Sequence, residues 1–297
     1  MTGKERIETL LKGEKPDSLP LMHVTMMAAA DIIGVKYGKY ASDYRIHGEG
    51  QEKIAEYYDL DYVSAISDPA VEAHDCGAAV VFYEDQPPAV DEKNALLADK
   101  KVLNRLHPPK PENGKRMANR VNVVSELKRR VGNEKMVEGW IEGPCAEAAD
   151  LRGINRLMLD FYDDPGFIRD LFEFIIALEI EFLKAQVDAG ADIIGVGDAA
   201  ASLIGPALYE EMVWQYEERI ITAIHEMGAI GRLHICGNVT DICTGMGRLG
   251  FDIVDIDFLA PFDKARKDTG EGQVLLGNID PVRVLRNGSP ESVLREI

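Results

Sequence analysis

Residues 192–198 of the chain are Asp-Ile-Ile-Gly-Val-Gly-Asp, a short apolar run that ends on a carboxylate. A helical pattern over residues 206–227 follows, with Pro206 in its first turn and Gly228 after its end. A second apolar run then occupies residues 230–236. Short buried strands that alternate with amphipathic helices are typical of a parallel sheet covered by helices. This part of the sequence therefore predicts an α/β fold.

The same alternation extends over the whole chain. Seven segments have the length and composition of buried strands, and they are residues 19–24, 61–66, 136–141, 192–197, 230–236, 252–257 and 273–277. No Gly-rich phosphate-binding fingerprint follows the first of them, which argues against a dinucleotide-binding fold. The pattern predicts a (β/α)8 TIM barrel that forms a single domain over residues 1–297.

Three features depart from this regular pattern. Residues 25–43 are rich in Met, Ala and Gly without helical periodicity, and we expect a long loop that could act as a lid. Residues 76–114, approximately, are expected to form an inserted hairpin and an irregular excursion. The eighth strand is missing before residue 297. Because a closed barrel needs that strand to cover two sheet edges, we expect the polypeptide to continue beyond this residue.

Composition excludes several classes of partner. The formal net charge of −18 disfavours nucleic acid and anionic membranes, since both require a basic surface. No apolar run approaches the roughly 20 residues that span a bilayer, and the N-terminal residues lack a signal-peptide apolar region. Four cysteines in a chain of this length do not indicate a disulfide framework. We therefore expect reduced thiols and a cytoplasmic protein.

Polar residues follow almost every predicted strand, as they do at the catalytic rim of a TIM barrel. Asp68, Glu142 and Asp198 end the second, third and fourth strands and are candidate catalytic residues. Glu142 and Asp198 are expected to face the central cavity, where a carboxylate could also complete a tetrahedral metal site. Two alternatives stay open, because Asp198 could instead cap the helix that follows it and Glu142 could pair with a cation at the rim.

The fifth predicted strand ends with His234-Ile235-Cys236-Gly237-Asn238. In a strand, residues i and i+2 point to the same face, so His234 and Cys236 project side by side. An imidazole and a thiolate are ligands that zinc prefers. A buried cysteine beside a hydrogen-bonded histidine explains the spacing equally well, and the spacing alone does not decide between the two.

Four pieces of the sequence resemble the uroporphyrinogen decarboxylase superfamily, specifically its cobalamin-dependent methyltransferase branch. They are Glu142-Gly143-Pro144, Ala189-Gly190-Ala191-Asp192 with Gly197-Asp198, His234-Ile235-Cys236-Gly237-Asn238 and Gly277-Asn278-Ile279-Asp280-Pro281. The last piece marks the superfamily and the His-x-Cys piece marks the branch, which includes methylcobalamin:coenzyme M methyltransferases and zinc enzymes that demethylate methoxylated aromatics.

The resemblance implies roles for individual residues. His234 and Cys236 match the first two zinc ligands of the branch, and the third, a cysteine at the end of the eighth strand, would follow residue 297. Asp68 matches an acidic position that decarboxylases of the superfamily use for substrate binding. Asn238 and Asn278 are expected to contribute to cofactor binding, although Asn238 could simply form the turn.

The resemblance also implies a function, which is zinc-dependent transfer of a methyl group between a corrinoid, such as methylcobalamin, and a small thiol or methoxylated compound. The sequence has no Asp-x-His-x-x-Gly run of a cobalamin-binding domain, so a separate corrinoid-carrying protein is the expected partner. The alternatives are a porphyrinogen decarboxylase and an inactive barrel that acts as a binding protein. The decarboxylases carry an Arg-rich stretch after the first strand, whereas residues 23–40 here contain only Lys36 and Lys39 as cations besides the histidine.

Overall fold

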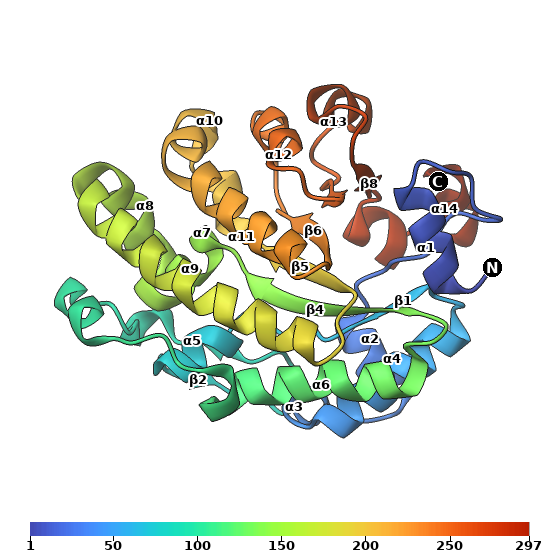
Figure 1. Ribbon diagram of the computed structural model, residues 1–297, viewed down its shortest axis with the longest axis horizontal. Coiled ribbons are helices and arrows are strands. Elements are labelled where there is room, and N and C mark those ends of the chain that lie inside the picture. Colours follow the sequence, from blue (N-terminus) through green and yellow to red (C-terminus); the bar gives the residue numbers. More distant parts are fainter. Residues whose placement is uncertain (297) are drawn as a thin grey trace.

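The computed structural model describes residues 1–296 and contains a curled sheet of six parallel strands (Figure 1). Their order across the sheet is β1 (Tyr62–Ser64), β4 (Met136–Glu142), β5 (Ile193–Gly197), β6 (Ile230–His234), β7 (Ile253–Asp255) and β8 (Val274–Leu276). Each strand pairs with the next in this order, so the sheet forms most of a TIM-barrel wall. The predicted α/β, TIM-barrel-like class is confirmed.

Helices cover the outer side of the sheet. In Figure 1, α6, α9, α11, α12 and α13 follow one another around the curve of the sheet, and α1 and α14 lie together near the two ends of the chain. The α-helices are α1 (Gly3–Leu11), α2 (Met26–Ile32), α3 (Tyr37–Ser42), α4 (Tyr44–Tyr57), α5 (Val71–Cys76), α6 (Arg116–Val131), α7 (Pro144–Arg152), α8 (Ile154–Asp163), α9 (Pro165–Asp188), α10 (Gly205–Leu208), α11 (Trp214–Glu226), α12 (Cys243–Leu249), α13 (Phe262–Thr269) and α14 (Pro290–Glu296). Shorter helical segments are η1 (Glu92–Asn94), η2 (Lys100–Arg105), η3 (Pro111–Asn113), η4 (Ala199–Leu203), η5 (Tyr209–Val213) and η6 (Pro281–Arg286).

Local sequence explains the boundaries of the longest helix. Asp164 precedes α9, and its carboxylate accepts a hydrogen bond from the backbone N–H of Phe167 at 3.2 Å. Pro165 occupies the first helical position, where no N–H is needed. The helix ends one residue before Ala189, and Gly190 follows with a φ of 111°, a conformation that glycine adopts readily. α9 is thus a capped helix of 24 residues that packs on β4 and β5.

Two apolar layers follow from the alternation of side chains along the strands. Odd-numbered positions of β5 and even-numbered positions of β4 and β6 face the inside of the curved sheet. The main core lies on the other side, between sheet and helices. A smaller cluster closes the bottom of the inside and consists of Ile7, Met22, Tyr62, Met136, Ile193 and Ile253. Polar inner residues therefore lie above this floor.

The first predicted strand, residues 19–24, is not a strand in the structure, and the sheet has six strands rather than seven. This segment accepts one backbone hydrogen bond at the edge of the sheet, from the Asp61 N–H to the Leu21 carbonyl at 3.0 Å. The Leu21 N–H is satisfied by the Asp61 side chain at 2.6 Å instead of by a neighbouring strand. Pro20 has no N–H to donate, so a regular ladder is not formed.

The predicted loop over residues 25–43 is also wrong, because this segment contains α2 and α3. Ala29 and Ala30 of α2 and Tyr37 and Tyr40 of α3 are fully buried. Helices of seven and six residues are too short for an apolar repeat to appear in the sequence. Farther along the chain, β2 (Val80–Val81) and β3 (Ala89–Val90) form an antiparallel hairpin, which is followed by η1, η2 and η3.

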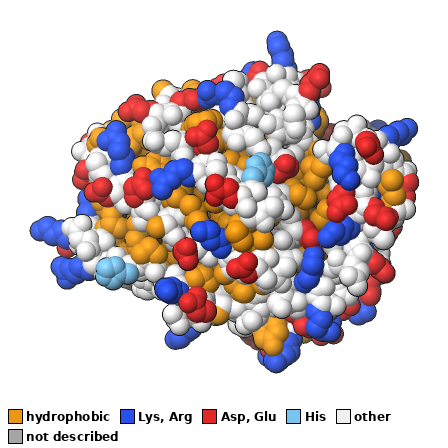
Figure 2. Space-filling view, in the orientation of Figure 1, with side chains coloured by type: hydrophobic (Ala, Val, Ile, Leu, Met, Phe, Trp, Pro, Cys, Tyr) orange, Lys and Arg blue, Asp and Glu red, His pale blue; other side chains and the backbone are white. Residues whose placement is uncertain are grey.

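The surface in Figure 2 carries both signs of charge, with hydrophobic side chains between them. None of the helices in residues 1–296 combines the length and apolar composition needed to cross a membrane.

Candidate functional site

Four residues at the carboxyl ends of neighbouring strands form a row across the sheet. Glu142 of β4 pairs in register with Gly197 of β5, Gly197 pairs with His234 of β6, and His234 pairs with Asp255 of β7. In-register neighbours lie about 5 Å apart and share a face. The row therefore brings a carboxylate, an imidazole and a second carboxylate together inside the curved sheet.

A tryptophan bridges the middle of this row. Side-chain atoms placed on Gly195 and Gly197 would lie 2.3 Å and 2.9 Å from the Trp140 indole, so the absence of side chains on β5 lets this ring lie over the strand. The indole Nε1–H donates to Glu142 Oε1 at 3.1 Å, and the ring centroid is 5.9 Å from that of His234. Trp140 thus connects Glu142 with His234.

Asp255 fixes the orientation of His234. Its Oδ2 lies 2.6 Å from His234 Nδ1, and the Arg232 guanidinium also donates to this carboxylate, at 2.8–3.1 Å. Burial opposes ionisation of Asp255, yet the charge of Arg232 and the bond with His234 lower its pKa to about 2. Burial likewise disfavours charged His234, but hydrogen bonds with Asp255 and Cys236 raise its pKa to about 9. Engaging Nδ1 leaves Nε2 as the nitrogen available to a further ligand.

Below this pair, Arg232 belongs to a buried network. Its Nη1 donates to Glu138 Oε1 at 3.1 Å and to the Tyr62 hydroxyl at 3.3 Å. The Arg232 side chain is 3% exposed, and the carboxylates of Glu138 and Asp255 compensate a cation that water does not reach. The network gives Asp255 a rigid support.

Cys236 is exposed and begins the loop after β6. The next residue, Gly237, has a φ of 101°, and a side chain there would approach Ser202 Oγ to 2.7 Å. Its N–H donates to Asp257 Oδ2 at 3.0 Å, which ties this loop to the end of β7. The loop geometry at the thiol therefore depends on glycine at position 237.

The two predicted cofactor-binding amides stabilise loops. Asn238 Oδ1 accepts from the N–H and the hydroxyl of Thr240, at 3.1 and 2.6 Å, which forms the turn. Asn278 Nδ2 donates to the carbonyl of Ala260 at 2.7 Å. Both residues lie near strand ends, and their side chains hold the surrounding backbone. Cofactor binding by them stays a prediction.

The residues present fit part of a zinc site. His234 and Cys236 supply a nitrogen and a sulfur donor from one face, and the carboxylate behind the imidazole is the outer partner that metal-bound histidines usually have. Within residues 1–296, no group of three or more His, Cys, Asp and Glu side chains has the geometry to hold a metal ion. The described chain thus offers two ligands.

Asp198 lies away from this row. It follows Gly197 by one residue, and its carboxylate is fully buried beside helix α7, where Oδ1 accepts from the N–H of Ala146 at 2.6 Å. Burial raises the pKa of Asp198 to about 7. Glu217, which accepts a hydrogen bond from the Tyr209 hydroxyl, is the neighbouring buried acid. The expected position in the central cavity is not observed. Asp198 caps the start of α7, and its side chain makes no cap bond to η4, the helical segment that follows it. A catalytic role of Asp198 remains a prediction.

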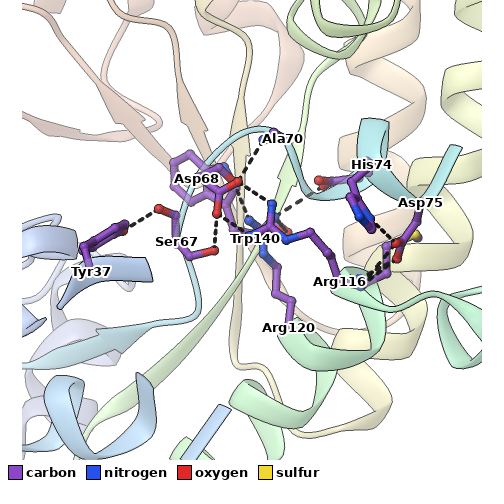
Figure 3. A network of polar contacts seen from close by, with 11 residues as sticks. Tyr37, Ser67, Asp68, Ala70, His74, Asp75, Arg116, Arg120 and Trp140 are labelled. Carbon is purple, nitrogen blue, oxygen red and sulfur yellow. Dashed lines mark hydrogen bonds and ion pairs between the residues drawn. The ribbon is translucent and has the colours of Figure 1, made fainter. Parts of the chain in front are cut away.

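Asp68 is also engaged in a buried ion pair, shown in Figure 3. Arg116 Nη1 and Nη2 donate to its two oxygens at 2.6 Å each, and the Ser67 hydroxyl donates to Oδ2 at 2.8 Å. Arg120 donates to the Asp68 carbonyl at 2.7 Å and to the Trp140 carbonyl at 3.2 Å. These contacts position the loop after β1, and a catalytic role of Asp68 remains a prediction.

Glu142 is the candidate carboxylate that reaches open space. It lines a cavity of about 300 Å³ together with Asp150 and mostly small apolar residues. Burial, followed by the nearby charges of Glu72 and Asp150, raises the pKa of Glu142 well above its usual value. Perturbed carboxyls in a cavity are a common feature of functional sites.

The sequence predictions missed Trp140, Asp255 and Asp150. Trp140 lies two residues before Glu142, so strand alternation places it on the same inner face, and Asp255 lies within the predicted strand 252–257. Asp150 belongs to a helix and carries no comparable pattern in the sequence.

A curved parallel sheet whose polar side chains gather at the strand carboxyl ends defines a TIM-barrel-type protein with its site at that rim. The chain belongs to the uroporphyrinogen decarboxylase (URO-D) family, whose sequence profile matches residues 2–297.

Individual relatives agree with this assignment. The chain is 28% identical over 300 residues to the methylcobamide:CoM methyltransferase MtbA of Methanosarcina mazei, covering 98% of this chain and 86% of the relative. It is 26% identical over 266 residues to a uroporphyrinogen decarboxylase of Nocardia farcinica, covering 82% and 73%. Among solved structures, a methyltransferase from Methanosarcina mazei superposes with a TM-score of 0.84 at 22% identity, covering 100% of this chain and 88% of that chain. The last similarity establishes the fold.

Proposed function

We propose that this protein is a zinc-dependent methyltransferase that moves a methyl group between a corrinoid and a small thiol or methoxylated compound. The observation that carries the proposal is the His234–Asp255 pair at the strand ends, with the exposed thiol of Cys236 two residues from the imidazole. The similarity over 98% of the chain to a protein named as a methylcobamide:CoM methyltransferase supports the same reaction class.

His234 and Cys236 would hold the metal. When bound, zinc would lower the pKa of a thiol substrate or polarise the oxygen of a methyl ether. Asp255 keeps His234 Nδ1 engaged, so that Nε2 is free for the ligand, and the Trp140 ring lies beside the imidazole at a tilt of 59°. The corrinoid would be delivered by a separate corrinoid-carrying protein at the open end of the curved sheet.

A porphyrinogen decarboxylase is less well supported by the described residues. A polycarboxylate substrate needs Arg or Lys side chains that are free to bind it. Lys36 is exposed and pairs with Asp85, and Lys39 is exposed on α3. Arg116 is already paired with Asp68. Among the residues that line the cavity beside Glu142 there is no Lys or Arg.

Metal analysis tests the proposal directly. We expect one zinc per chain in protein purified under reducing conditions, and loss of that zinc in His234→Ala and Cys236→Ser. Cys76→Ser, which changes a half-buried thiol elsewhere, is the matched control and retains the metal. Loss of methylcobalamin absorbance with a panel of thiols and methoxyarenes then measures methyl transfer. A metal-free protein that binds a porphyrinogen would refute the proposal.

A further inference from the structure

The cavity beside Glu142 lies next to the proposed metal ligands. Its walls come from the end of β4, one face of α7 and the segment η4. Ser202, which lines the cavity, is the residue that a side chain on Gly237 would strike, and Gly237 directly follows Cys236. Glu142 is bonded to Trp140, whose ring lies 5.9 Å from that of His234. At about 300 Å³ the cavity has room for one small molecule.

Two side chains give this cavity its charge. Glu142 is 5% exposed; Trp140 donates to its Oε1, and among the described residues no hydrogen bond reaches Oε2. Asp150 Oδ2 is also buried, and it has no hydrogen-bond partner within residues 1–296. The remaining lining residues are apolar, apart from the neutral hydroxyl of Ser202. A ligand in this cavity would therefore meet two carboxyl oxygens without hydrogen-bond partners, Glu142 Oε2 and Asp150 Oδ2.

Among the described residues, the charge of Arg120 offsets only part of the effect of the acids around Glu142. The two nearby arginines, Arg116 and Arg120, are engaged with Asp68, with Glu72 and with backbone carbonyls. Further buried acids lie behind the wall, and the carboxylate oxygens of Glu147 and Glu179 have no hydrogen-bond partner among the described residues.

Burial and the surrounding acids raise the pKa of both cavity carboxyl groups, Glu142 and Asp150. Burial, followed by the charges of Glu72 and Asp68, raises the pKa of Asp150 to about 8. Both carboxyls therefore hold a proton near neutral pH. An anionic group placed here would lose its hydration without meeting a cation, which is unfavourable in a region of low dielectric. An ammonium group would gain an ion pair when one carboxyl releases its proton, and a hydroxyl group would gain hydrogen bonds.

We propose that this cavity holds the non-reacting end of the methyl donor or acceptor and selects a cationic end group over a neutral one, and a neutral one over an anionic one. The inference rests on the proposed methyltransferase function, which it deepens by naming the substrate class. Substrates that carry an ammonium or hydroxyl group at the end remote from the reacting sulfur or oxygen fit this class, and sulfonates, carboxylates and phosphates do not.

Three methyl thioethers that differ only in the end group test the order. They are CH3-S-CH2-CH2-X, in which X is an ammonium, a hydroxyl or a sulfonate. Because none has a free thiol, differences in thiol pKa do not affect the comparison. Binding is followed by the fluorescence of Trp140 in a Trp214→Phe background, since the chain has two tryptophans. We expect the ammonium compound to bind at least about tenfold more tightly than the sulfonate.

Substitution of the two cavity carboxyl groups tests whether this preference arises in the cavity. Asp150→Asn and Glu142→Gln are each expected to bring the ammonium-to-sulfonate affinity ratio toward one. Asp163→Asn makes the same substitution of an amide for a carboxyl at an exposed position on the neighbouring helix α8, and it should leave the ratio unchanged. Equal binding of the three compounds, tighter binding of the sulfonate, absence of binding, or an unchanged ratio in Asp150→Asn would each overturn the inference.

Zinc content and methyl transfer, measured on the same preparations, separate this inference from the proposed function. A zinc-containing protein that transfers methyl groups but prefers the sulfonate retains the function and overturns the inference. A protein that takes up no zinc but binds the three compounds in the expected order supports the cavity preference and overturns the function.

Discussion

The most informative perturbation is Asp255→Asn, because it changes the partner of His234 without touching either proposed zinc ligand. The asparagine side chain can still accept a hydrogen bond from Nδ1, but it lacks the negative charge that makes the 2.6 Å contact strong. Removing such an outer partner commonly lowers metal affinity about 10–100-fold, or about 1.4–2.7 kcal/mol. We expect a loss of zinc affinity in this range.

A matched control is available in the same network. Glu138→Gln removes the other carboxylate that contacts Arg232, at 3.1 Å, and leaves the bond between Asp255 and His234 intact. In both variants Arg232 keeps one carboxylate, so each should lose less stability than the roughly 3–5 kcal/mol of a fully broken buried pair. Glu138→Gln is expected to lower the unfolding free energy and to bind zinc with wild-type affinity.

Competition with a chromophoric chelator at fixed pH measures the zinc affinity of wild type and both variants, and urea unfolding measures their stability. Wild-type zinc affinity in folded Asp255→Asn would refute the orienting role of this carboxylate. An equal loss of affinity in Glu138→Gln would show that the effect comes from general destabilisation of the Arg232 network.

Three further outcomes follow from buried groups and from the loop at the thiol. Burial raises the pKa of Glu179 well above its usual value of 4.5, so the folded state keeps a proton that the unfolded chain releases. This group lowers the unfolding free energy by about 1.4 kcal/mol per pH unit above that value, and other buried acids add to the slope. In urea titrations from pH 5 to 8, Glu179→Gln should reduce the slope by this amount, whereas Glu181→Gln, exposed on the same helix, should leave it unchanged. Asp68→Asn leaves a buried arginine without its charge partner, and we expect a loss of about 3–5 kcal/mol in urea unfolding; a loss below about 1 kcal/mol would contradict the ion-pair interpretation. Gly237→Ala should weaken zinc binding, because the new side chain would displace the loop. Gly228 also has a positive φ, but a side chain there meets open space, so Gly228→Ala should change stability alone. Equal zinc affinity in the two variants would argue against a crowded loop.

The sequence predicted the central strands well because their pattern is local. Each of the segments 136–141, 192–197 and 230–236 has an apolar run of strand length, flanked by residues that end helices or begin turns. The segment 19–24 has the same apolar composition, but its pairing depends on Asp61, a residue 40 positions away that satisfies the Leu21 N–H with its side chain. A contact between residues so far apart cannot be inferred from a local sequence pattern.

The candidate site was predictable only to the level of strand ends. Position at a strand end correctly placed Glu142 and His234 in one row. The same criterion selected Asp68, whose charge is satisfied by Arg116 from helix α6, 48 residues away. Whether a carboxylate at the rim is free or paired depends on partners from other elements, which the sequence alone does not identify.

Strand alternation explains why Asp198 and Glu142 differ although both end a strand. Gly197 is the inner-facing residue of β5, since a side chain there would meet Trp140 and Glu142. The next residue must then face the helices, where Asp198 accepts from the N–H of Ala146. The pair of inner glycines on β5 thus has two effects, because it admits the indole between Glu142 and His234 and places the following carboxylate in the helix layer.

The face of the sheet on which a residue lies determines whether its substitution should change ligand binding or stability. On the inner face, Glu142 and His234 reach open space or solvent, and substitutions there should change ligand binding. On the outer face, Asp198 is fully buried, so Asp198→Ala should cost the stability of a helix cap, about 1 kcal/mol, and leave zinc affinity intact. Loss of zinc from folded Asp198→Ala would mean that this carboxylate acts on the inner face, and the assignment of faces on β5 would have to be reversed.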